Sequence, residues 1–251
     1  MVFAHPDDEV IALGGRLRRF HHFHFVHVTD GAPRNERDSR LHGLASWRAY
    51  RDARAREFSK MLEVAGITNL HYEGFDIPDQ EAAFHLDLLT KKIEALLETA
   101  LPDVLFTHPY EGGHPDHDAC AFAVSHAVFR HAARGKQVPL IVECAFYHAG
   151  RDGIEAGCFL ERTGKRALIY ALSSKEQRDK QKLLDCFQTQ KNTLRYFRTD
   201  TESFRVAPRY DFTQPPHRGV LFYEHFPWGM SAKEFCKNAA EAQDRLLMEA
   251  M

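Results

Sequence analysis

Two short clusters of histidine and carboxylate side chains stand out in this chain of 251 residues. The first is the run AHPDDE at residues 4–9, and the second is the run HPDH at residues 114–117. Imidazole nitrogens and carboxylate oxygens bind catalytic divalent metal ions, and the same groups act as general acids and bases. Each cluster also contains a proline, which restricts the turn that carries it. Together the clusters predict a hydrolytic metal site with acid–base groups beside it.

The first cluster lies between an apolar run and a helical pattern. His5 precedes a proline, which disfavours the α conformation, so we expect it at the end of a strand. The acidic residues that follow are typical of the first turn of a helix. Across this turn His5 and Asp8 can converge on one cation. Asp7 would then point elsewhere and remain unligated.

The second cluster repeats this layout. The apolar run at residues 104–107 predicts a buried strand, and we expect a helix to begin near His117. His5, Asp8 and His117 with one water molecule would give the ligand pattern of a catalytic zinc site. Both clusters follow the carboxyl end of a predicted strand, where active sites form in open α/β sheets. One His-Pro-Asp turn is most often only a capped turn, but two in equivalent places favour the metal site.

The two motifs together resemble the PIG-L / LmbE-like superfamily of zinc-dependent de-N-acetylases. The resemblance covers residues 1–150 best. It implies a metal-dependent hydrolase that removes an N-acetyl group from a small N-acetylated sugar or glycoside, such as an N-acetylglucosaminide. It also implies Zn²⁺ as the cofactor, and Fe²⁺ is a second ion that the same ligand types accept.

The resemblance assigns metal and base roles to the first motif and to the end of the second. By this resemblance His5, Asp8 and His117 match the zinc ligands. Asp7 matches the general base that activates water. We therefore expect that loss of Asp7 leaves the metal in place and abolishes turnover.

The resemblance also assigns roles around these ligands. His114 matches the residue that assists the tetrahedral intermediate, which we expect to act as an imidazolium, and Asp116 would orient its ring. Arg54 and Asp79 fall where the family places substrate-binding residues.

The composition narrows the class of partner. The net charge is −2 and no basic stretch is concentrated, which argues against nucleic acid and favours a small-molecule substrate. No apolar run reaches membrane-spanning length, and the amino-terminal residues lack a signal-peptide pattern. The five cysteines are scattered without a CxxC pair, so we expect reduced thiols and a cytoplasmic location. The sequence does not indicate an oligomeric state.

The pattern of elements predicts an α/β fold in a single domain over residues 1–251. Strands are expected near residues 1–4, 23–28, 67–72, 103–107 and 139–146, and helices near residues 8–20, 46–65, 84–100 and 117–134. This alternation predicts a Rossmann-like, mostly parallel sheet with helices on both faces. Residues 1–150 would form the catalytic core, and residues 151–251 would complete the sheet and the rim of the pocket.

Several segments carry separate expectations. The polar stretch 29–45 is expected to be a substrate-facing lid, because long loops in compact domains are usually functional. The capping-box spacing from Ser173 predicts a helix start. Residues 198–219 are expected to be a loop, residues 219–223 a last strand and residues 231–249 a final helix. For Trp228 we expect burial rather than stacking on a sugar.

Three other functions remain open on the sequence. Two histidines and a carboxylate also describe an Fe(II) oxygenase, although such enzymes usually have jelly-roll folds. A non-catalytic carbohydrate-binding protein could retain the fold, but it would need neither Asp7 nor His114. A related amidohydrolase could act on another small amide, such as a mycothiol- or bacillithiol-type conjugate.

Overall fold

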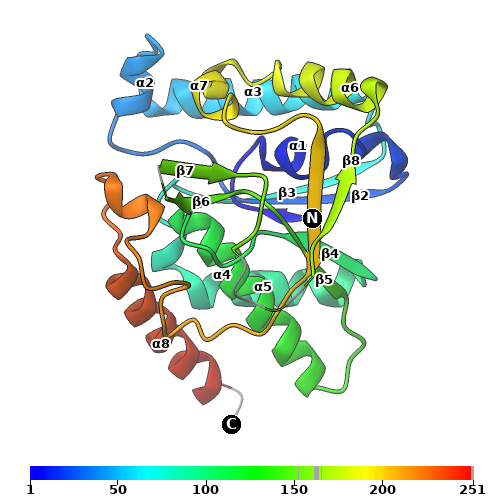
Figure 1. Ribbon diagram of the computed structural model, residues 1–251. Coiled ribbons are helices and arrows are strands. Elements are labelled where there is room, and N and C mark those ends of the chain that lie inside the picture. The colour runs from blue at the N-terminus through cyan, green and yellow to red at the C-terminus, as the bar shows by residue number, and fades with distance from the viewer. Residues whose placement is uncertain (152, 161–163, 165, 250–251) are drawn as a thin grey trace.

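A layer of β-strands runs through the middle of the molecule, between two layers of helices (Figure 1). The computed structural model describes residues 1–151, 153–160, 164 and 166–249. The strands are β1 (Val2–Phe3), β2 (Phe23–Thr29), β3 (Leu70–Ile77), β4 (Val104–Thr107), β5 (Leu140–Cys144), β6 (Tyr147–Gly150), β7 (Gly153–Ala156), β8 (Leu168–Ala171) and β9 (Thr201–Val206).

The strands divide into a parallel part and an antiparallel edge. Strands β1, β2 and β3 pair in parallel in that order, and β4 pairs in parallel with β5. Strand β1 packs beside β4, so the two parallel groups continue as one layer. Strand β9 is antiparallel to β5 and β8, and β6 and β7 form a separate antiparallel pair. The expected α/β fold with a mostly parallel sheet is confirmed for the first half of the chain.

The helices cover both faces of this layer, as the sequence predicts. They are α1 (Asp8–Leu13), α2 (Arg37–Leu41), α3 (Trp47–Ala65), α4 (Leu86–Ala100), α5 (Pro115–Ala133), α6 (Ser174–Leu184), α7 (Lys191–Leu194) and α8 (Ala232–Met248). Short 3-10 helices are η1 (Leu17–Arg19), η2 (Ala82–Phe84), η4 (Gln188–Gln190) and η5 (Phe222–His225). Figure 1 shows α3 and α6 on one side of the strands and α4, α5 and α8 on the other.

Each face of the sheet has its own hydrophobic core. On the α4, α5 and α8 side, Val26 and Leu105 of the strands pack with Ile93 and Leu246 of the helices. On the other side, aromatic residues such as Phe25 pack against α3 and α6. Two separate cores make the sheet a fixed platform, because its strands are held from both faces.

Helix α3 explains how an arginine reaches the interior. Ser46 caps its start by accepting a hydrogen bond from the Ala49 amide, and Gly66 ends it with φ 70°. Between them the buried residues recur at helical spacing: Tyr50, Arg54, Phe58, Met61 and Ala65. Arg54 is therefore the charged member of an otherwise apolar stripe, and it faces the sheet.

Helix α5 begins earlier than predicted. We expect a start near His117, but the helix begins at Pro115. Proline is pre-organised for the first helical position, and the His114 side chain caps the helix by accepting from the Asp116 amide. The HPDH motif is therefore the helix's first turn. The first helix is shorter than the predicted 8–20, because Gly14 and Gly15 follow α1 and glycine disfavours helix.

The carboxy-terminal part contains the largest differences from expectation. The loop predicted at 198–219 includes strand β9. Its charged residues are buried as ion pairs, so the sequence lacks the apolar pattern of a buried strand. Glu202 of β9 accepts from the amide of Gly15 and from Lys180, whose side chain is 1% exposed. The strand predicted at 219–223 is wrong: no strand lies there, and η5 begins within it. Leu221 is buried there against Gly112 instead.

Two further expectations concern the whole described chain. All five cysteines are free thiols, as the scattered pattern predicts. Among the described residues, no helix combines the length and apolar character needed to cross a membrane.

A buried charge cluster joins β5 to β9. Arg205 lies opposite Glu143 in the strand register and donates to it at 2.7 Å. Arg205 also donates to Glu111 at 2.9 Å, so one guanidinium serves two buried carboxylates. Tyr210 donates to Glu143 at 3.0 Å. Burial outweighs Arg205 and raises the pKa of each glutamate to about 7.

This cluster predicts a pH-dependent stability. The ordinary pKa of glutamate is 4.5 and the folded value is about 7, so the folded chain binds more protons in this window. The cluster's contribution to the unfolding free energy therefore falls as pH rises through the window and levels off above it. We expect Glu143→Gln to gain about 1–3 kcal/mol relative to wild type between about pH 5 and pH 8. Urea unfolding measures this difference.

The control is the exposed residue Glu63, because Glu63→Gln removes the same charge from the surface. This variant should keep a constant offset from wild type across the range. A constant offset for Glu143→Gln as well would contradict the prediction.

Candidate metal centre and active site

The predicted site residues gather where β1 and β4 end and where α1 and α5 begin. Strand β1 has β2 on one side and β4 on the other, so successive connections leave it in opposite directions. Open α/β sheets form a crevice at such a reversal. The turn after β1 carries His5 and Asp7, and α1 begins at Asp8. His114 and His117 come from the first turn of α5.

Three side chains are placed to hold one metal ion. The ligand atoms of His5, Asp8 and His117 all lie within 4.8 Å of one another, and all three residues are buried. Nδ1 of His5 is 3.4 Å from one Asp8 oxygen, and Nε2 of His117 is 3.6 Å from the other. The His5 amide donates to Asp8 at 2.7 Å, which fixes the carboxylate. Two imidazoles and a carboxylate fit a divalent transition metal.

A fourth histidine supports this group. The His108 ring stacks on that of His117 with centroids 3.9 Å apart. Nε2 of His108 accepts from the Ala4 amide at 3.0 Å and lies 3.2 Å from Asp8. Sequence reasoning missed this residue. The sequence does contain a signal, because the pair His108-Pro109 follows β4 as the pair His5-Pro6 follows β1.

Asp7 lies outside the ligand group and is held in a strained backbone. Its φ is 137°, where side-chain-bearing residues are rare. Its carboxylate accepts from Arg54 at 3.0 Å, and its carbonyl accepts from the amides of Val10 and Ile11. The pKa of Asp7 is raised to about 7, because burial outweighs the effect of Arg54. A carboxylate with such a pKa is suited to move a proton near neutral pH.

Arg54 is more deeply placed than a substrate-binding role alone would require. It is 2% exposed, although it lines the cavity described below. A Cβ at Gly31 would lie 2.8 Å from Nε of Arg54, so the guanidinium packs on a glycine that also has φ 65°. The family resemblance implies contact with substrate for Arg54. Its direct contact in the structure is with Asp7.

Asp116 joins the two motifs from the centre of the site. It is fully buried, and its oxygens accept from the amides of Gln80 at 2.7 Å and Ala82 at 2.9 Å. One of these oxygens is 3.2 Å from Nε2 of His5 and 3.7 Å from Nδ1 of His114. The expected partner was His114, but the closer ring is that of His5. Asp116 therefore holds the ring of His5 and the loop after β3.

His114 and Asp79 face each other beside this carboxylate. Nε2 of His114 is 3.7 Å from Asp79, and Asp79 is 3.1 Å from Nε2 of His5. Because Nδ1 of His114 accepts from the Asp116 amide, the ring's proton is assigned to Nε2. Burial and the nearby His5 lower the pKa of His114 well below its ordinary value. In its neutral form the ring can donate a hydrogen bond from Nε2.

These residues open into a cavity of about 650 Å³. Asn35, Arg37, Asp38, Leu41 and His42 line it, so the stretch 29–45 lies where a lid is expected. The ring of Trp228 is 4.5 Å from that of His114 and 4.5 Å from that of Phe226. The expectation of a buried tryptophan is wrong, since Trp228 is half-buried at the cavity wall.

A family model described as PIG-L, GlcNAc-PI de-N-acetylase, matches residues 1–128, which include both motifs, Arg54 and Asp79. The chain belongs to the PIG-L family. A PIG-L relative from Bacillus cereus, the probable N-acetyl-alpha-D-glucosaminyl L-malate deacetylase 2, is 34% identical over 142 residues. That match covers 52% of this chain and 60% of the relative's length.

Solved structures support the PIG-L fold at low identity. The A40926 pseudoaglycone deacetylase has a TM-score of 0.61 at 16% identity, covering 84% of this chain and 96% of that one. The N,N'-diacetylchitobiose deacetylase of Pyrococcus horikoshii has a TM-score of 0.56 at 18% identity, covering 82% of both chains. A Pseudomonas putida 4-carboxy-2-hydroxymuconate hydratase reaches 0.50 at 16% identity, covering 84% and 96%. The fold alone therefore does not select a reaction.

The geometry predicts which side chains bind the metal. His117→Ala removes an imidazole from the group of three, so we expect it to lose most of its affinity for a divalent cation. Asp7→Ala should bind one ion per chain as the wild type does, because Asp7 is held by Arg54. Calorimetric titration of metal-stripped protein with Zn²⁺ measures both. Loss of the ion in Asp7→Ala would mean that Asp7 is a ligand.

The backbone at Asp7 predicts a matched pair of stabilities. Asp7→Ala and Asp7→Gly both remove the carboxylate, but only glycine adopts a positive φ without strain. We expect Asp7→Gly to be more stable than Asp7→Ala by about 1–3 kcal/mol, measured by urea unfolding. Equal stability of the two variants would show that the turn is unstrained.

Proposed function

We propose that this protein is a zinc-dependent deacetylase that hydrolyses the N-acetyl group of a small N-acetylated sugar or glycoside. The observation that carries the proposal is the position of Asp7. It is a proton-accepting group next to a three-residue metal site, yet Arg54 keeps it from joining that site. Membership of the PIG-L family and the activity of the Bacillus cereus relative support the same reaction.

Each residue of the site has a role in this proposal. His5, Asp8 and His117 would hold the zinc, which when bound polarises an acyl carbonyl and lowers the pKa of water. Asp7 accepts the proton from the attacking water and later gives it to the leaving amine. The products are acetate and a free amino sugar.

The remaining groups orient the reaction. His114 donates from Nε2 to the oxygen that becomes negative in the transition state, which is where preorganised donors contribute most. Asp116 positions the His5 ring, and through its amide it also fixes the tautomer of His114. Asp79, in the loop after β3, faces Nε2 of His114 and can accept a hydrogen bond from a hydroxyl group of the sugar.

The cavity suggests the kind of group attached to the sugar. Arg37 and Arg195 line its outer part, and both are exposed. Guanidinium groups favour carboxylates, so the proposed substrate class includes glycosides of small acids. The substrate named for the Bacillus cereus relative, an N-acetylglucosaminyl malate, is of this class.

The test is acetate release by the zinc-loaded protein over N-acetylglucosamine, diacetylchitobiose and N-acetylglucosaminyl malate. We expect release from at least one of them, and a loss of about 10²–10⁴-fold in kcat in Asp7→Asn, because a general base contributes that much. Asp52→Asn is the matched control, since Asp52 is an exposed residue of α3.

Two results would count against the proposal. One is the absence of acetate release from the whole panel by protein that holds one zinc ion per chain. The other is full activity in Asp7→Asn. A dependence of turnover on O₂ would instead favour the Fe(II) oxygenase.

A further inference from the structure

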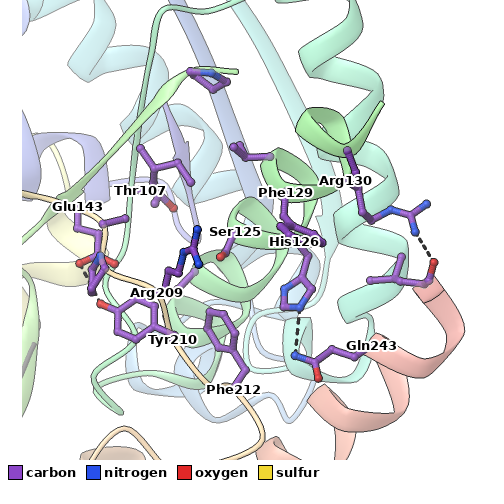
Figure 2. Close-up of a pocket in the computed structure, with 18 of the residues that line it drawn as sticks. Thr107, Ser125, His126, Phe129, Arg130, Glu143, Arg209, Tyr210, Phe212 and Gln243 are labelled. Carbon is purple, nitrogen blue, oxygen red and sulfur yellow. Dashed lines mark hydrogen bonds between the residues drawn. The ribbon is translucent and has the colours of Figure 1, made fainter. Parts of the chain in front are cut away.

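A second cavity, larger than the catalytic one, lies against helix α5. Its volume is about 960 Å³, at the upper end of the range of small-molecule sites. Its walls are α5, strands β4, β5 and β9, helix α8 and the segment 206–212. Figure 2 looks into it, with α5 and α8 carrying Ser125 and Gln243 on one side and Tyr210 on the other. The cavity is not lined by the candidate metal-binding residues His5, Asp8 and His117, nor by Asp7 or His114.

Most of this cavity is apolar, and its rim exposes large side chains to water. The apolar lining is formed by Ala121, Val128, Phe129, Leu140, Ile141, Val206, Phe212, Leu246 and Leu247. Phe129 is 69% exposed and Leu247 is 62% exposed. Exposed apolar side chains that gather around a concave surface indicate a binding site, where a bound ligand would cover them.

Three polar groups line one part of the cavity: Thr107 is buried, Ser125 is half-buried and Arg209 is exposed at the mouth. Figure 2 shows the hydroxyl groups of Thr107 and Ser125 and the guanidinium of Arg209 directed toward each other. The Thr107 side chain is buried, with the residue 1% exposed, and its hydroxyl has no hydrogen-bond partner. An orphaned buried hydroxyl is costly, so it marks a place where a partner is expected.

Arg209 supplies a positive charge near these two hydroxyl groups. The neighbouring arginines of the rim are already engaged, since Arg130 and Arg134 both donate to Glu94. Within the described parts of the chain, Arg209 forms no ion pair. Glu143 lies on the cavity wall, but its carboxylate is occupied by Arg205 and Tyr210. Among the described residues that line the cavity, Arg209 is therefore the arginine without a carboxylate partner.

We propose that this cavity binds a small amphipathic carboxylate, an apolar chain that ends in a carboxylate group. The carboxylate accepts from the Arg209 guanidinium and from the hydroxyls of Thr107 and Ser125. The chain lies along the apolar wall between α5 and α8 and covers Phe129. A guanidinium with two hydroxyls matches the fixed acceptor geometry of a carboxylate, whereas an uncharged apolar molecule would leave all three donors unpaired.

The experiment is a calorimetric titration of the metal-loaded protein with decanoate, below the concentration at which decanoate aggregates. We expect one molecule to bind per chain. Arg209→Gln should weaken binding by about tenfold or more, because it removes a charge-assisted contact. Ser125→Phe fills the cavity and should abolish binding. Decanol should bind wild type less tightly than decanoate does, and Arg209→Gln should remove this preference.

The matched control is Arg178→Gln, which removes the same charge from an exposed position on α6. It should bind decanoate as wild type does. The proposal is overturned if decanoate does not bind, or if Arg209→Gln and Ser125→Phe bind it as wild type does. It is also overturned if many decanoate molecules bind per chain, because this would indicate non-specific hydrophobic adsorption. A dimer that dissociates when this face is altered would also overturn it, since a second copy would then be the occupant. Deacetylase turnover by Arg209→Gln should equal wild type, which separates this test from that of the proposed reaction.

Discussion

The fully buried carboxylate of Asp116 is the interaction on which the site depends. Asp116 belongs to the first turn of α5. Its carboxylate accepts hydrogen bonds from two backbone amides of the loop after β3 and contacts the ring of His5, which follows β1. Three chain segments that are distant in sequence therefore meet at one side chain. A buried charge is stable only when such partners satisfy it, so the loops cannot separate without exposing an expensive group.

A second constraint is the symmetry of the two strand ends. A His-Pro pair follows β1 and another follows β4, and each pair places a histidine near Asp8. His5 presents Nδ1 to the ligand group, while His108 stacks under His117 and bonds to the Ala4 backbone. His108 also lines the larger cavity next to α5. The His108 ring thus lies between the candidate metal group and the larger cavity, which His5, Asp8 and His117 do not line.

The sequence predicts the fold class, the location of the site and the convergence of both motifs, because each depends on local patterns. It does not predict where α5 begins, since this depends on how Pro115 and the His114 side chain cap the helix. It also hides β9, because Glu202 and Arg205 are polar residues whose partners come from other elements. These features depend on contacts between residues that are far apart in the sequence. Local sequence patterns do not reveal such contacts.

The backbone at Asp7 has an evolutionary consequence. A positive φ favours glycine, so folding alone would replace this aspartate, and only chemistry would keep it. If Asp7 is the general base proposed above, the substitution that ends turnover would also stabilise the chain. A glycine at this position in a relative would then indicate that the architecture was kept after the proposed reaction was lost.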